Sequence, residues 1–198
     1  ESISGMELWL DGNNVNADSL ADSITSGSPL YIWNDSSGNN RNAIQATPAN
    51  APIYIKNASE LTGKGFVDFS SVTKTLELPA VNGPKTIFAI FRQTGLAAKT
   101  KLLGGDLVST STSGNVALQR EGGNPLIDSS TSAAAFHIAT WQGEAGSYAL
   151  HVDGAAKGSG TDAQSLAALT KVGNDLIGQV TEIVVYNRVL PSPTQRKI

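Results

Sequence analysis

The feature that most constrains this fold is a β-branched run near the C-terminal end, Gly178-Gln-Val-Thr-Glu-Ile-Val-Val-Tyr-Asn-Arg-Val-Leu190. Side chains of an extended strand alternate between the two faces of a sheet, and beyond Glu182 both faces of this run are mostly apolar. A strand that is apolar on both faces has to be covered on both sides. The run therefore predicts a central strand in a structure of two packed layers.

The residues after this strand carry a helix-start signal. Ser192 suits the N-cap position, Pro193 suits the first helical position, and Gln195 can close a capping box. The chain stops at Ile198, after barely one helical turn. We therefore expect the start of a C-terminal helix, and residues 1–198 to be a fragment of a longer chain.

Composition favours a single all-β domain. The 198 residues suffice for one hydrophobic core. Only 16% of them are charged, and Gly, Ser, Asn and Thr are abundant, as in turn-rich β proteins. Short apolar runs recur along the chain, including Met6–Leu10, Thr86–Arg92, Ala135–Trp141 and Ser147–Asp153. Such spacing predicts a closed or double-sheet architecture with adjacent termini.

Charge and cysteine content exclude several classes of function. The formal net charge is −3 and no cluster of Lys and Arg occurs, so the electrostatic footprint of a nucleic-acid-binding protein is missing. The chain has no cysteine, which excludes disulfides, thiolate zinc sites and cysteine nucleophiles. No window approaches the length of about 18 apolar residues that a membrane helix needs, so direct membrane insertion is not expected.

Four motifs follow one another along the chain: Leu8-Trp-Leu-Asp-Gly12, the loop Trp33–Ala43, Trp141 with Val152-Asp-Gly154, and the run Gly178–Leu190. Together they resemble the laminin G-like members of the concanavalin A-like lectin/glucanase superfamily, and the resemblance runs from end to end. It implies a single jelly-roll sandwich of two antiparallel sheets over residues 1–198. It also implies that the closing helix continues beyond Ile198.

Laminin G-like domains often hold one Ca²⁺ at a rim of the sandwich through an aspartate, another side-chain oxygen and backbone carbonyls. The loop richest in such oxygens supplies Asn34, Asp35 and Asn39, which become the candidate calcium ligands. Second-rank candidates are Asp106, Asp128 and Asp153. The alternative is a plain tight turn, because Asn, Asp and Ser also satisfy the backbone hydrogen bonds of turns.

Carbohydrate recognition calls for an exposed aromatic ring beside Asn, Asp or Arg. The polar loop and its flank offer that combination, and the candidate ligand-binding residues are Tyr31, Trp33, Asn39 and Arg41. Trp33 can also be a core residue. Alternation along their strands predicts that Trp9 and Trp141 belong to the core.

Catalytic residues are not indicated. The glucanases of this superfamily carry Glu-x-Asp-x-Glu on one strand, and Glu182 is followed on its face by Val184 and Tyr186 instead. Glu182 is therefore interpreted as a paired residue of the sheet surface. His137 and His151 lie on adjacent predicted strands and could meet across them. No third zinc ligand accompanies them, so two ordinary sheet histidines are the alternative.

These observations lead to an expected function. We expect a non-catalytic carbohydrate-binding or adhesion module of a larger extracellular or surface-displayed protein, with a glycan or a cell-surface receptor as partner. A virion structural or attachment domain, in contact with other virion or adhesin subunits, is the alternative, since cysteine-free sandwiches rich in Gly, Ser and Asn suit it too. Glycan hydrolysis is a remote alternative. The expected location is extracellular, at a cell surface or on a virion surface.

Overall fold

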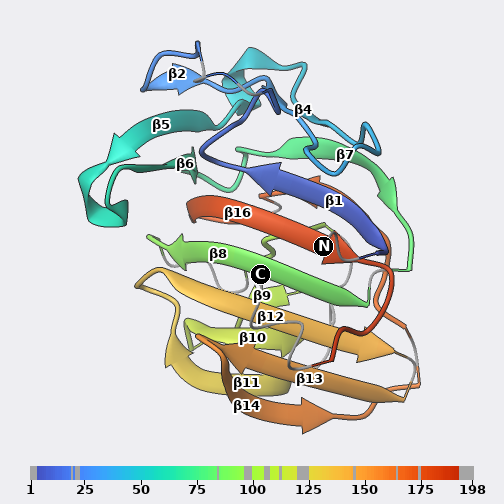
Figure 1. Ribbon diagram of the computed structural model, residues 1–198. Helices are drawn as coiled ribbons and strands as arrows, with labels where there is room; N and C mark the ends of the chain where they lie inside the picture. Colours follow the sequence, from blue (N-terminus) through green and yellow to red (C-terminus); the bar gives the residue numbers. More distant parts are fainter. Residues whose placement is uncertain are drawn as a thin grey trace.

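The β-branched run forms strand β16 (Gly178–Tyr186), the central strand of the larger sheet layer in this computed structural model (Figure 1). It pairs antiparallel with β8 (Thr86–Gln93) along one edge. Along the other edge it pairs with β6 (Lys64–Phe69) and β1 (Met6–Asp11). The predicted central strand is confirmed, and so is the prediction that the first and last strands are neighbours.

The structure describes residues 4–18, 20, 23–83, 85–95, 100–104, 108–111, 113–119, 125–144, 146–163, 165–173 and 175–191, with the backbone alone at 108–110 and 125–126. Within this part the larger sheet has nine strands. Its remaining strands are β2 (Ser28–Pro29), β5 (Ile53–Ala58), β12 (His137–Glu144), β13 (Ser147–Val152) and β14 (Ala155–Gly160). Their order is β14-β13-β12-β8-β16-β6-β5-β2, and β1 lies beside β16.

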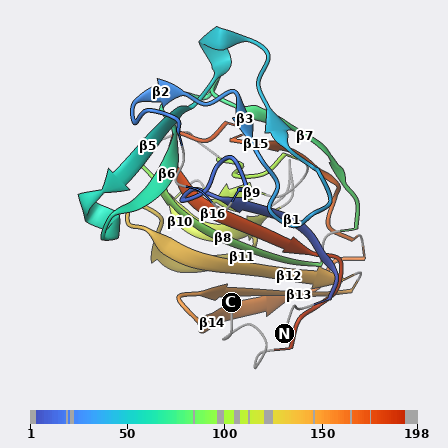
Figure 2. The same cartoon turned by 45° about the horizontal axis from the view of Figure 1, so that its top comes forward.

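The second layer consists of two smaller sheets. One has the order β15-β7-β4-β3 and the other β11-β10-β9. Their strands are β3 (Ile32–Trp33), β4 (Ala43–Ile44), β7 (Leu76–Val81), β9 (Val108–Thr110), β10 (Asn115–Gln119), β11 (Pro125–Ser132) and β15 (Leu169–Val172). Two short 3-10 turns, η1 (Pro48–Asn50) and η2 (Ser59–Leu61), complete the described elements. In Figure 2, β3, β7 and β15 lie above β1 and β16, which belong to the larger sheet. The predicted all-β, antiparallel sandwich is confirmed.

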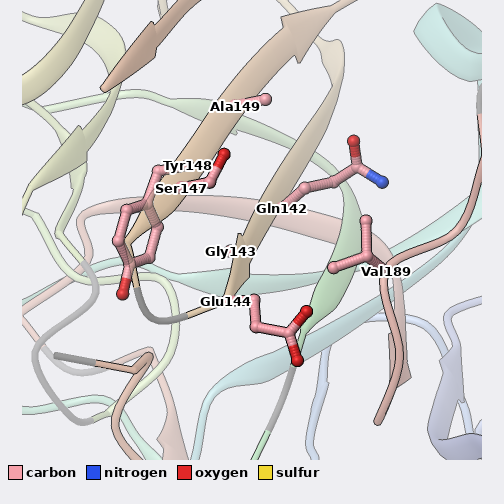
Figure 3. A pocket seen from close by; sticks show the side chains of 7 residues that line it. All are labelled: Gln142, Gly143, Glu144, Ser147, Tyr148, Ala149 and Val189. Atoms are coloured by element: carbon pink, nitrogen blue, oxygen red, sulfur yellow. The ribbon is translucent and has the colours of Figure 1, made fainter. Parts of the chain in front are cut away.

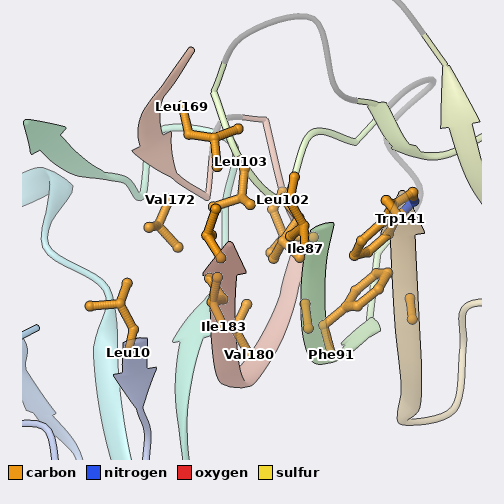
Figure 4. Packing of buried hydrophobic residues seen from close by; sticks show 14 of the residues in the cluster. Leu10, Ile87, Phe91, Leu102, Leu103, Trp141, Leu169, Val172, Val180 and Ile183 are labelled. Atoms are coloured by element: carbon orange, nitrogen blue, oxygen red, sulfur yellow. The ribbon is translucent and has the colours of Figure 1, made fainter. Parts of the chain in front are cut away.

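The hydrophobic core fills the space between the two layers (Figure 4). Buried residues of the larger sheet include Leu10, Phe91, Trp141, Val180 and Ile183. The side chains that face them include Leu102, Leu103, Leu169 and Val172. Each apolar side chain removed from water in this way stabilises the fold by roughly 1.5–3 kcal/mol.

The outer face of β16 is covered differently. Val184 and Tyr186 pack with Phe88 and with Leu190, which belongs to the segment that follows β16. Trp9 packs against the rim of this small cluster. The prediction that both faces of the strand are covered is therefore confirmed. The segment that follows β16, and not another sheet, covers the outer face.

A β-bulge between Val180 and Glu182 marks the point where the neighbour of β16 changes from β6 to β1. Backbones crowd at this junction. The Gly12 amide donates to the Thr181 carbonyl at 2.7 Å, and a β-carbon on Gly65 would lie 2.2 Å from the Gly12 carbonyl oxygen. Glycine is needed here because any side chain would collide with backbone.

The predicted helix start at Ser192, Pro193 and Gln195 lies outside the described residues. Among the described residues, no helical segment has the length and hydrophobicity of a membrane-spanning helix.

Candidate functional site

The polar loop (residues 34–42) covers the outer edge of β1. The Trp9 amide donates to Asp35 Oδ1 at 2.9 Å, and the Ser36 amide donates to the Trp9 carbonyl at 2.8 Å. Asn39 Nδ2 donates to the Glu7 carbonyl at 3.2 Å. The loop thus supplies β1 with hydrogen bonds that a neighbouring strand would otherwise make, which protects an edge from pairing with other chains.

Asp35 is the centre of that loop. Its Oδ1 accepts hydrogen bonds from the amides of Trp9 and Ser37, each at 2.9 Å, and its Oδ2 accepts from Ser37 Oγ at 2.9 Å and the Arg41 amide at 3.0 Å. The side chain is 7% exposed. A calcium ion on Asn34, Asp35 and Asn39 would have to displace several of these donors, so calcium binding stays a prediction.

The other predicted metal ligands are also engaged. Asp128 Oδ1 accepts from Asn115 Nδ2 at 3.0 Å, and Asp153 Oδ2 lies 2.7 Å from His137 Nδ1. Asp106 lies outside the described residues. Among those that are described, no group of three or more His, Asp or Glu side chains could hold a metal ion.

The four predicted ligand-binding residues do not form one open site. Trp33 is fully buried, and its Nε1 donates to the Asp11 carbonyl at 3.0 Å, so the interpretation as a surface platform is corrected. Arg41 Nη1 pairs with Glu7 Oε2 at 2.6 Å, and Asn39 is bonded to β1. Tyr31 is exposed. The strand β3 turns Trp33 inward because its alternate neighbour Ile32 takes the outer face.

The aromatic residue that does reach the surface beside carboxylates is Trp9. The sequence predicted Trp9 in the core, but Leu8 and Leu10 occupy the core side of β1, and Trp9 lies partly exposed on the outer face. Its Nε1 donates to Glu182 Oε1 at 2.8 Å. Trp141, by contrast, is fully buried as predicted.

A second carboxylate stands beside this pair. Asp11 is the register partner of Glu182 across β1 and β16, and its Oδ1 accepts from the Asn13 amide at 2.8 Å. Burial raises the pKa of the Glu182 carboxyl; the Trp9 hydrogen bond opposes this shift, the Asp11 charge adds to it, and Lys64 opposes it. We call Trp9, Asp11 and Glu182 the Trp9 cluster. It combines an aromatic face with acceptors for hydroxyl groups.

Trp9 and Glu182 are 173 positions apart, and no local pattern links them. Two signals together could have found them. In the run Met6–Leu10, Trp9 alternates with Leu8 and Leu10 and so lies on the opposite face, although we expected it in the core, and the termini were expected to be adjacent. Pairing β1 with β16 then brings the indole to Glu182, which is indeed paired at the sheet surface.

The two histidines are not brought together. Thr140, and not His137, lies opposite His151 in the pairing of β12 with β13. His137 and Thr140 are three positions apart, so their side chains point to opposite faces of the sheet. His137 instead contacts Asp153 and lies 3.0 Å from the Ser132 carbonyl through Nε2. The contact between the histidines that the sequence left open does not form.

Comparison with known proteins gives matches of fold. No protein-family model matches the sequence, and no curated protein matches it. Among solved structures, domain 4 of AbnA, a GH43 extracellular arabinanase from Geobacillus stearothermophilus in complex with arabinotriose, aligns with a TM-score of 0.65 and 14% identity, over 96% of this chain and 97% of that one.

Two further kinds of structure align with the chain. Trypanosoma rangeli sialidase in complex with sialic acid gives a TM-score of 0.64 at 16% identity, over 98% of this chain. The chain spans about a third (32%) of that sialidase. The binding domain of Paraclostridial Mosquitocidal Protein 1 gives 0.53 at 12% identity, over 96% of this chain and 50% of that one. At these identities the likeness shows a shared β-sandwich fold.

Proposed function

We propose that this domain is a non-catalytic carbohydrate-binding module of laminin G-like type within a larger extracellular or surface-displayed protein. The observation that carries the proposal is the Trp9 cluster, a partly exposed indole held beside two carboxylates on the outer face of the larger sheet. The likeness to an arabinanase domain in complex with arabinotriose supports it, because that match covers nearly all of both chains.

The cluster suits a sugar ring. The C–H face of the ring stacks on the indole of Trp9, and ring hydroxyls donate to the carboxylates of Asp11 and Glu182. The hydrogen bond to Glu182 holds the indole in place, and so does its packing against the outer-face cluster that contains Leu190. A fixed ring loses little conformational entropy on binding, which favours affinity.

Isothermal titration calorimetry with neutral oligosaccharides, beginning with arabinotriose, tests the proposal. We expect Trp9→Ala to weaken binding at least tenfold, about 1.4 kcal/mol, and Trp9→Phe to retain part of the affinity because stacking persists. Tyr31→Ala, which removes a different exposed aromatic, is the matched control and should bind as the unaltered protein does. Equal losses in the Trp9→Ala and Tyr31→Ala variants, or no binding by the unaltered chain across the panel, would refute the proposal.

Glycan hydrolysis is a second candidate that one observation favours. Asp11 and Glu182 are cross-strand partners, so their side chains lie on the same face of the sheet, and retaining glycosidases use a pair of neighbouring carboxyl groups. The raised pKa of Glu182 suits a general acid. Release of reducing sugar that disappears in Glu182→Gln and Asp11→Asn would establish hydrolysis, whereas binding without release supports the non-catalytic module.

A further inference from the structure

A separate hollow of about 240 Å³ lies where β12 and β13 meet the segment that follows β16 (Figure 3). Its lining residues are Gln142, Gly143, Glu144, Ser147, Tyr148, Ala149 and Val189. Figure 3 shows the side chains of Gln142, Glu144 and Val189 together, with the Tyr148 ring turned away from them. None of these residues belongs to the Trp9 cluster.

The floor of the hollow is tightly built. A β-carbon on Gly143 would lie 2.3 Å from the Tyr148 ring, which packs beneath the strand. Gln142 is only 7% exposed, and its Nε2 donates to the Leu190 carbonyl at 2.7 Å. That bond fixes the amide orientation. No residue that the structure describes donates a hydrogen bond to Gln142 Oε1, so a buried side chain presents an acceptor that the protein itself does not use.

The walls combine polar and apolar groups. Glu144 forms an ion pair with Lys85 at the rim, and Ser147 adds a hydroxyl. Ala149 and the 45% exposed Val189 contribute apolar surface. Clefts that enclose drug-sized ligands have volumes of roughly 300–1,000 Å³. The hollow is smaller, so it accommodates a single ring.

We propose that this hollow is a second glycan subsite that takes one neutral sugar ring. Ring hydroxyls donate to Gln142 Oε1 and to the Glu144 carboxylate, and the C–H face of the ring contacts Val189. Both polar groups accept hydrogen bonds, which suits the hydroxyl donors of a neutral sugar. This inference rests on the proposed carbohydrate-binding function and adds a site and a ligand class to it.

The two subsites share one face of the larger sheet. β12 is separated from β1 by β8 and β16, which corresponds to three strand spacings of about 4.8 Å each, or roughly 14 Å. The Leu190 backbone lies between them, bonded to Gln142 of β12 and to Thr86 of β8, so an oligosaccharide that occupies both subsites passes over this segment. Its affinity should increase with length, and the increase should depend on the hollow.

Calorimetry and NMR on the 198-residue chain test the subsite with arabino-oligosaccharides of increasing length. Ala149→Leu fills the hollow, and Ala156→Leu, at an exposed alanine of β14, is the matched control. We expect Ala149→Leu to weaken binding of the longest oligosaccharide at least fivefold and Ala156→Leu to leave it unchanged. Arabinotriose should also shift the side-chain amide signals of Gln142 in the unaltered protein. This measurement does not depend on whether a variant folds.

The outcomes separate the two proposals. If Trp9→Ala abolishes binding while Ala149→Leu has no effect and the Gln142 signals do not move, the second subsite is refuted and the carbohydrate-binding function stands. If sialyllactose binds more tightly than lactose and shifts the Gln142 signals, the assignment to neutral sugars is wrong. If no oligosaccharide binds the unaltered chain, the carbohydrate-binding function itself fails.

Discussion

The polar loop and the Trp9 cluster lie on two sides of the same strand, β1, and use similar residue types in opposite ways. In the loop, Asp35 accepts four hydrogen bonds from the chain, and Asn39 and Arg41 donate into β1. In the cluster, the carboxylates of Asp11 and Glu182 have few partners and face outward. The comparison teaches that polar composition alone does not mark a binding site. A binding site is marked by polar groups whose hydrogen-bonding capacity the fold leaves unused.

The largest effect that tests this comparison is on stability. Asp35→Ala leaves four donors without their acceptor, and we expect it to lower the free energy of unfolding by about 2–4 kcal/mol, measured by urea denaturation. Ser36→Ala is the control in the same loop. Ser36 Oγ has no hydrogen-bond partner in the described structure, so its removal should be neutral or slightly stabilising.

A loss below about 1 kcal/mol in Asp35→Ala would show that the loop does not depend on this carboxylate. The same variant should bind oligosaccharide normally at temperatures where it remains folded, because the loop is structural and the Trp9 cluster is the site.

Arg41 gives a second, smaller test of the loop. Its Nη1 contacts both the carbonyl and the carboxylate of Glu7, at 2.7 and 2.6 Å. Arg41→Ala should lower the free energy of unfolding by about 1 kcal/mol, with a smaller loss in Arg41→Lys, and urea denaturation measures both. Oligosaccharide affinity should change less than twofold. A tenfold loss of affinity would return Arg41 to the binding site that the sequence predicted.

The third test concerns the pH dependence of the cluster. Burial raises the pKa of Glu182 above its ordinary 4.5, so the folded state keeps this proton at pH values where the unfolded chain has released it. The associated stability is complete below about pH 4.5 and is lost as pH rises through the folded pKa. Ionisation of the partly buried Glu182 carboxyl therefore costs stability in the folded protein.

Glu182→Gln removes that charge and keeps an acceptor for the Trp9 indole. We expect it to raise the Tm at pH 7 by about 1–3 °C, and calorimetry between pH 4 and 7 should show the gain shrinking toward the acidic end. Glu77→Gln, at an exposed glutamate paired with Lys171 at 3.0 Å, should show no such gain. A Tm that falls in Glu182→Gln at pH 7 would mean that the ionised carboxylate stabilises the cluster.

The fold could be predicted because the decisive signals are local. The β-branched run identified β16, and the alternating runs before and after residue 145 identified the hairpin of β12 and β13. The turn after β13 uses Asp153 and Gly154 at positive φ, which is the conformation that this residue pair favours. Dense β-branched residues and turn residues act within a few positions, so one sequence suffices to find them.

The site could not be predicted in the same way. Asn, Asp and Ser satisfy a turn and a ligand equally well, and only the tertiary structure shows that the partners of Asp35 are internal. The Trp9 cluster needs the pairing of the first and last strands. Trp33 was misplaced because its two-residue strand is too short for alternation to decide which face is buried.

The smallest expected effect is that of calcium, and it bears directly on the loop. Binding to the folded state alone raises stability by RT ln(1 + [L]/Kd), so a Ca²⁺ site would raise the Tm relative to a sample with chelator. The carboxylate of Asp35 already accepts four hydrogen bonds, and we expect a difference below about 1 °C. A rise of several degrees that Asp35→Asn abolishes would show that a cation displaces those donors, and the polar loop would then be a metal site as well as an edge cover.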